Sequence, residues 1–203
     1  MSIGFEAVFS SANKPLLEIL SAVKSALRDF EIDFPDETHQ SLDEQTTSVI
    51  GGPSWVTLHC VSQSLWAALG PGDAAEVDVT ISKSKQGLYL KYQEHRAAFR
   101  RRLGDERLAG ELYGLLLRFC SEVGSRVCIY DEESSTGFDP PTVEKVRRIL
   151  EAKQFSSGGK EGVIVLSQEL MSLREAQALC PKPPRVSLTG EWLVFKLLSS
   201  GRT

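Results

Sequence analysis

The chain has 203 residues, 41% of them hydrophobic and 25% charged, with a formal net charge of −4. This length can bury one sizeable core or two small ones, and the composition excludes a chain that is disordered throughout. The longest apolar run is far shorter than the roughly 20 residues that span a bilayer, and residues 1–9 lack the basic segment of a signal peptide, so we expect a cytoplasmic protein.

The first 92 residues contain more strand patterns than helix patterns. Leucines and valines at three- and four-residue spacing predict an amphipathic helix over about 14–29, and Leu65 to Leu69 fits a short buried helical turn. Residues 35–48 are acidic and predict an exposed loop. Period-two alternation of apolar residues predicts strands at 3–9, 30–34, 55–61, 77–81 and 88–92. Ser84 to Gly87 joins the last two strands as a hairpin.

The remaining residues alternate between helices and short strands. Asp105 is a predicted N-cap and Gly124 a predicted C-cap of the clearest helical stripe, over 108–123. Further helices are predicted at 94–103, from Asp139 through about 150, and from Ser167 through 179. Strands are predicted at 127–130, 163–166 and 192–198, with a polar loop at 131–137.

These elements predict an α+β fold, in which a mixed or mostly antiparallel sheet packs against several amphipathic helices. A single domain over 1–203 is the simplest organisation. A glycine- and serine-rich break at 156–159 leaves room for a C-terminal subdomain from about residue 157.

The sequence motifs give no cofactor or metal site. Gly70, Gly72 and Ala75 fit the dinucleotide pattern G-x-G-x-x-A, but Pro71 occupies the turn and a strand-like run follows instead of a helix. Asp131 begins a run of oxygen ligands that lacks the glycine and glutamate of an EF-hand loop. We therefore expect no cofactor and no dedicated metal centre.

Cysteines and histidines are too scattered to form a recognisable catalytic motif. The spacing of Cys60, Cys120, Cys128 and Cys180 matches no zinc site, and buried free thiols are the simplest interpretation. An enzyme with a dispersed active site stays open as an alternative, because tertiary structure can gather distant residues. Its candidate residues are His59, Cys60, His95, Asp131 and Glu133.

Charge is spread unevenly along the chain. Residues 1–82 carry a net charge of −9, residues 83–126 carry +5, and residues 127–203 carry 0. The basic segment from Arg96 to Arg107, with Phe99 among its arginines, admits nucleic-acid binding as a second alternative. A solvated helix face, or pairing of these arginines with the acidic N-terminal third, is the simpler interpretation, and the negative net charge weighs against a general nucleic-acid binder.

The acidic segments favour a non-enzymatic protein-binding protein whose partner has a basic surface, because complementary charge accelerates association and selects partners. Small acidic cytoplasmic α+β proteins of bacteria include immunity proteins that neutralise antibacterial toxins, although no motif in this chain carries that likeness. The excess of arginine over lysine and the single asparagine suit a bacterial origin. The predicted partner-binding residues are Asp36, Glu37, Trp55, Asp131, Glu132, Glu133 and Asp139.

Overall fold

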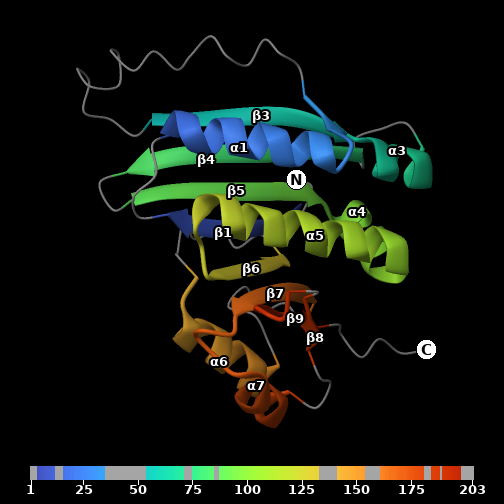
Figure 1. Ribbon diagram of the computed structural model, residues 1–203. Helices are drawn as coiled ribbons and strands as arrows, with labels where there is room; N and C mark the ends of the chain where they lie inside the picture. Colours follow the sequence, from blue (N-terminus) through green and yellow to red (C-terminus); the bar gives the residue numbers. More distant parts are fainter. Residues whose placement is uncertain are drawn as a thin grey trace.

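The computed structural model describes residues 4–11, 16–34, 54–70, 75–84, 87–132, 141–153, 161–180, 184–187 and 189–197. In this part of the chain, nine strands form one sheet in the order β2-β3-β4-β5-β1-β6-β7-β9-β8, and every neighbouring pair is antiparallel. Six helices pack against this sheet (Figure 1). The α+β fold predicted from the sequence is confirmed.

The element bounds follow the predicted pattern closely. The strands are β1 (Gly4–Ser11), β2 (Ile32–Asp33), β3 (Ser54–Ser62), β4 (Glu76–Ser84), β5 (Gly87–His95), β6 (Val127–Glu132), β7 (Gly162–Ser167), β8 (Arg185–Val186) and β9 (Trp192–Leu197). The helices are α1 (Leu16–Asp29), α3 (Gln63–Leu69), α4 (Arg96–Gly104), α5 (Glu106–Val123), α6 (Val143–Ala152) and α7 (Leu173–Leu179).

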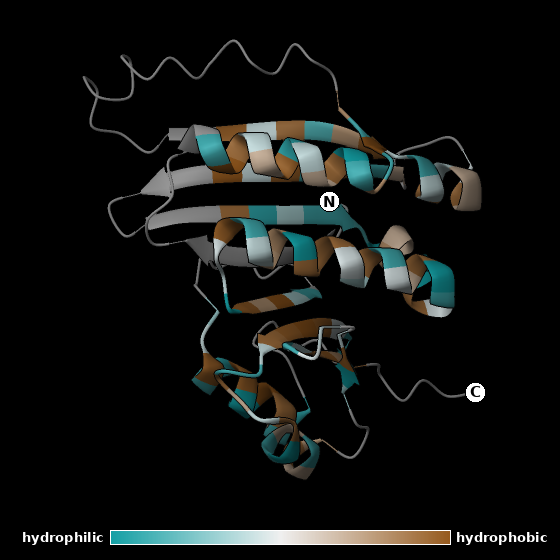
Figure 2. Cartoon of the chain, in the orientation of Figure 1, coloured by the Kyte–Doolittle hydropathy of each residue, from teal (hydrophilic) through white to brown (hydrophobic). Residues whose placement is uncertain are grey.

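The larger core lies between one face of the sheet and helices α1 and α5, which run side by side across it (Figure 1). The two helices approach each other closely at Gly114, where an added Cβ would lie 2.9 Å from a ring carbon of Phe30. Figure 2 shows apolar stripes along both helices beside polar ones, which is the pattern that lets one helix face pack while the other meets water.

A second core lies on the opposite face of the sheet, over the strands β6, β7 and β9. Val127 and Ile129 of β6, Ile164 and Leu166 of β7, and Phe195 of β9 pack there with residues of α6 and α7. The intervening residues of these strands belong to the larger core, so β7 is buried along its whole length. This end of the sheet is therefore covered on both faces.

Local capping fixes the ends of α5 as the sequence predicts. The Asp105 carboxylate accepts hydrogen bonds from the backbone N–H groups of Arg107 and Leu108, at 3.0 and 3.2 Å. Gly124 follows the helix with φ +72°, a left-handed conformation that glycine adopts at little cost.

The structure corrects three predicted boundaries. Asp131 and Glu132, predicted to open a loop, continue strand β6 because they pair with β1. The N-cap of α6 is Thr142 instead of Asp139, and the N-cap of α7 is Ser172 instead of Ser167. In each corrected helix the capping oxygen accepts a hydrogen bond from the backbone N–H three residues later, which Asp139 and Ser167 are too far upstream to do.

Candidate protein-binding surface

The face of β3, β4 and β5 that points away from α1 and α5 carries polar side chains. Strand alternation sends the apolar residues of these strands into the core and their neighbours to the other face. We call these outward residues, together with Asp131 of β6, the polar sheet face. It comprises Thr57, His59, Glu76, Asp78, Thr80, Lys91, Gln93 and Asp131, all partly or fully exposed.

Two cross-strand contacts order the centre of the polar sheet face. Nδ1 of His59 lies 2.7 Å from Oδ1 of Asp78, and the two side chains are 73% and 46% exposed. Beside them, the hydroxyls of Thr57 and Thr80 are 3.0 Å apart. Both pairs stand directly opposite each other in the β3–β4 register, so the sheet itself holds them in place.

The strand register extends this row across the sheet to β6. Asp78 is opposite Gln93 of β5, Gln93 is opposite Glu6 of β1, and Glu6 is opposite Asp131 of β6. The row from His59 to Asp131 therefore crosses five strands, or roughly 19 Å at the usual strand spacing. Three of its five positions carry carboxylate residues, so the row is acidic.

Three of the seven predicted partner-binding residues lie in the described part of the chain, and their role in binding stays a prediction. Asp131 lies in the polar sheet face, and Glu132 follows it on β6. Trp55 is opposite Ser82 in the β3–β4 register. The four remaining predicted residues, Asp36, Glu37, Glu133 and Asp139, lie outside the described residues.

Sequence reasoning missed Thr57, Asp78, Thr80 and Gln93. The signal that identifies them is present, because in the middle of β3, β4 and β5 these polar residues alternate with apolar residues that face the core. The same alternation predicts which residues share a face. It does not predict which strands are neighbours, and the row depends on that order.

The coverage of this face changes along the sheet. Over β6, β7 and β9 the face is apolar and packs against α6 and α7, whereas over β3, β4 and β5 it is polar and exposed in the described part of the chain. In Figure 1, α6 and α7 lie at the β7–β9 end, far from β3. This face therefore has one half that α6 and α7 cover and, over β3, β4 and β5, another half that they do not cover.

A buried ionic cluster joins the end of the interior strand β5 to α4. Nε of Arg102 donates to Oε2 of Glu94 at 2.9 Å, and the Tyr92 hydroxyl donates to the same oxygen at 2.9 Å. The second terminal nitrogen of Arg102 donates to the Ser62 hydroxyl at 3.3 Å. The Arg102 side chain is 2% exposed and that of Glu94 is fully buried, so this cluster is part of the fold and cannot contact a partner.

The charges in this cluster change the pKa of its members. Burial acts to lower the pKa of Arg102, but the facing Glu94 carboxylate, together with Tyr92 and Tyr130, more than offsets that effect and raises the pKa. Burial and Glu94 raise the pKa of Tyr92 well above its ordinary value. Arg102 therefore stays charged and Tyr92 stays a neutral hydrogen-bond donor at physiological pH.

Two further arginines of the basic segment, Arg100 and Arg107, also have acidic neighbours. Arg100 lies 3.5 Å from Glu161, and Arg107 forms an i,i+4 ion pair with Glu111. Neither of these partners, nor Glu94, belongs to the acidic residues 1–82, so the predicted pairing with the N-terminal third is wrong for these three arginines. Their ion pairs and the burial of Arg102 leave less basic surface than the sequence suggests for nucleic-acid binding.

The candidate residues of a dispersed active site do not converge in the described structure. His59 and Asp131 stand at opposite ends of the polar row, while Cys60 faces the core, where burial raises its thiol pKa to about 12. His95 accepts a hydrogen bond from the backbone N–H of Ala97 and caps α4. All four cysteines are buried and free, as predicted. Glu133 lies outside the described residues.

The described residues contain no group of three or more histidine, cysteine or acidic residues placed to hold a metal ion. None of the helices that the structure describes has both the length and the apolar character needed to cross a membrane.

Comparison with known proteins finds one distant structural likeness. No protein-family model and no curated protein matches the chain. A chain from the crystal structure of the toxic C-terminal tip of CdiA from Pseudomonas aeruginosa in complex with immune protein is similar in structure, with a TM-score of 0.38 and 13% sequence identity. The match covers 68% of this chain and 90% of that chain. The function proposed below rests on the geometry of this chain and not on that likeness.

Proposed function

We propose that this chain is a non-enzymatic protein-binding protein of the immunity type, which neutralises an antibacterial toxin by binding it through the polar sheet face. The observation that carries the proposal is the change in coverage along one face of the sheet. Helices cover that face where it is apolar, whereas the described polar side chains over β3, β4 and β5 are partly or fully exposed.

The charge of this half favours a basic partner. Residues 1–82, which include β1 to β3 and most of β4, carry a net charge of −9. On the polar sheet face, Glu76, Asp78 and Asp131 are three carboxylates beside one lysine, Lys91. A surface of this sign steers a basic protein into contact and repels acidic ones, which increases both the association rate and the selectivity.

The first experiment compares two charge reversals on opposite sides of the sheet. Asp78→Lys changes the charge at the centre of the polar sheet face. Asp29→Lys is the control, because it makes the same change in charge on α1. The Asp29 side chain is 59% exposed, and its carboxylate lies 4.0 Å from Arg118. Wild-type protein and both variants are used to capture partners from a lysate of the native host at low salt. We expect one stoichiometric basic protein with wild type and Asp29→Lys, and its loss with Asp78→Lys.

The second experiment tests the immunity role directly. The captured protein is expressed in a bacterial host with and without this chain, and growth is measured. We expect the partner alone to stop growth, wild-type chain to restore it, and Asp78→Lys to restore it poorly. Equal capture by Asp78→Lys and wild type would refute the assigned surface, and a captured protein that is harmless to the host would refute the immunity role.

A further inference from the structure

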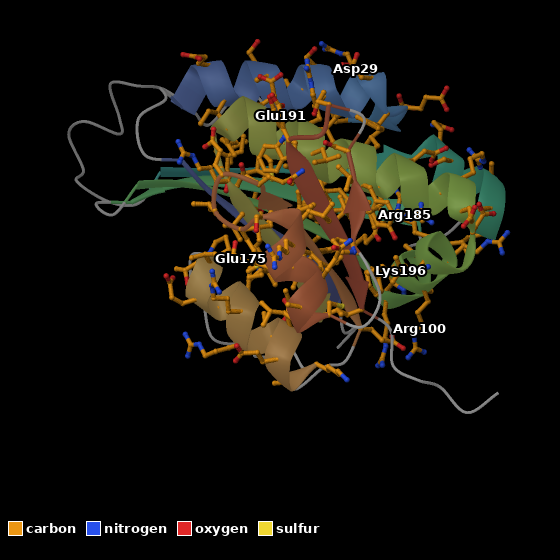
Figure 3. The ribbon with its side chains drawn as sticks, turned by 60° about the horizontal axis from the view of Figure 1, so that its bottom comes forward. Asp29, Arg100, Glu175, Arg185, Glu191 and Lys196 are labelled. Carbon is orange, nitrogen blue, oxygen red and sulfur yellow. The ribbon has the colours of Figure 1, made fainter. Side chains whose placement is uncertain are left out.

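A cleft opens on the side of the sheet that α5 covers, away from the polar sheet face. It has a volume of about 570 Å³ and lies where the C-terminus of α5, the start of β6, the turn after β7 and the start of β9 meet. Its lining includes Gly124, Arg126, Gln168, Glu169, Glu191 and Trp192. In Figure 3, Glu191 projects beside α5.

Backbone hydrogen bonds hold the walls of this cleft together. The Gln168 N–H donates to the Glu191 carbonyl at 2.8 Å, and the Gln168 side-chain amide donates to the Gly190 carbonyl. The Ser167 N–H donates to the Arg126 carbonyl at 2.9 Å. Gln168 therefore joins the segment that carries Glu169 to the segment that carries Glu191, which fixes how these two backbones lie relative to each other.

The charge of the cleft favours a cation. Arg126 lies 3.3 Å from Glu169 and balances that carboxylate, whereas the Glu191 carboxylate has no ion-pair partner among the described residues. The 18-residue helix α5 ends at the cleft, and a helix C-terminus adds about half a negative charge. The charged residues that line the cleft are Glu169, Glu191 and Arg126, so the lining has one more acidic residue than basic ones before the helix end is counted.

We propose that this cleft binds the guanidinium group of an arginine side chain presented by a partner protein. A guanidinium is planar, has five N–H donors and can stack on the partly buried Trp192 ring while it donates to Glu191. The cleft is open to solvent, which leaves room for the polypeptide that carries the arginine. This inference is independent of the proposed function, because the cleft lies on the other side of the sheet.

The test uses the full chain and short capped peptides of the form Gly-Arg-Gly. Binding is followed by the NMR signal of the Trp192 indole N–H, assigned with a Trp192→Phe variant. We expect a saturable shift with a dissociation constant on the order of 1 mM, because one side chain supplies few contacts. Glu191→Gln is expected to weaken binding about tenfold, because it removes one charge-assisted hydrogen bond.

Two controls make the inference refutable. Glu151→Gln changes an exposed carboxylate on α6 and should leave the affinity unchanged. A peptide with citrulline in place of arginine has nearly the same shape without the charge and should not bind. Equal binding of the citrulline peptide, an unchanged affinity in Glu191→Gln, or the absence of any Trp192 shift would overturn the proposal. A lysine peptide that binds as tightly as the arginine peptide would overturn the guanidinium assignment.

Discussion

Replacement of Arg102 by leucine should destabilise the protein severely, because it leaves a carboxylate buried without its counter-charge. Glu94 is fully buried, and in Arg102→Leu it keeps the Tyr92 hydroxyl as a donor but loses the guanidinium. Breaking a buried ion pair in this way typically costs about 3–5 kcal/mol. Because whole domains are stable by only about 5–15 kcal/mol, we expect a large decrease in the free energy of unfolding measured with urea at pH 7.

Two companion variants separate the charge effect from the loss of packing. Arg101→Leu makes the same substitution at the next residue of α4, where the side chain is exposed, and should change stability by less than about 0.5 kcal/mol. Arg102→Leu combined with Glu94→Gln removes both charges and should recover much of the lost stability. If the double variant is no more stable than Arg102→Leu, the cost comes from packing and the electrostatic reasoning is refuted.

Four further predictions concern substitutions at single positions. In α5, Gly110→Ala meets no atom within 4 Å and should raise the free energy of unfolding in urea by about 0.5–1 kcal/mol. Gly114→Ala forces the Phe30 ring to move and should lower it by about 1–3 kcal/mol, so equal effects would contradict the α1–α5 packing. Ser172→Ala removes the N-cap of α7 and should lower the free energy of unfolding by about 1 kcal/mol, which lowers the midpoint temperature of thermal unfolding. An unchanged midpoint temperature would show that the cap is dispensable. The Cys60 pKa of about 12 lies above the ordinary 9.0, so its contribution to stability is complete below pH 9 and is lost as the pH rises toward 12. Urea titrations over that range should therefore show a smaller decline for Cys60→Ala than for wild type, and parallel curves would contradict the shift.

Local chemistry made some elements predictable from the sequence. Asp105 and Gly124 bound α5 because an N-cap carboxylate and a left-handed glycine act on their own helix, within a few residues. The apolar alternation of β4 and β5 likewise indicates both strands and the core-facing side of each. These signals are contained in short windows, and the structure follows them.

Long-range pairing explains what the sequence could not predict. Asp131 looks like a loop residue by composition, and it is a strand residue because Glu6, 125 positions earlier, lies opposite it. Strand β8 has only two residues, which is too short to show an alternation. The polar row across five strands depends on a strand order that no local pattern encodes. The sequence therefore predicts that each member is a polar residue of a strand, but it does not predict that these residues lie next to one another.

The central position of β1 has a consequence for how the chain is made. This strand leaves the ribosome before the other eight described strands, yet its two neighbours are β5 and β6, and Phe5 pairs with both Glu94 and Glu132. At about 5–20 residues per second, synthesis needs roughly 6–25 s to proceed from Phe5 to Glu132. Both edges of β1 lack their final partners until β5 has been made, and one edge still lacks β6 until Glu132 has been made. The two halves of the sheet can therefore join only after this early strand has been inserted between strands made later.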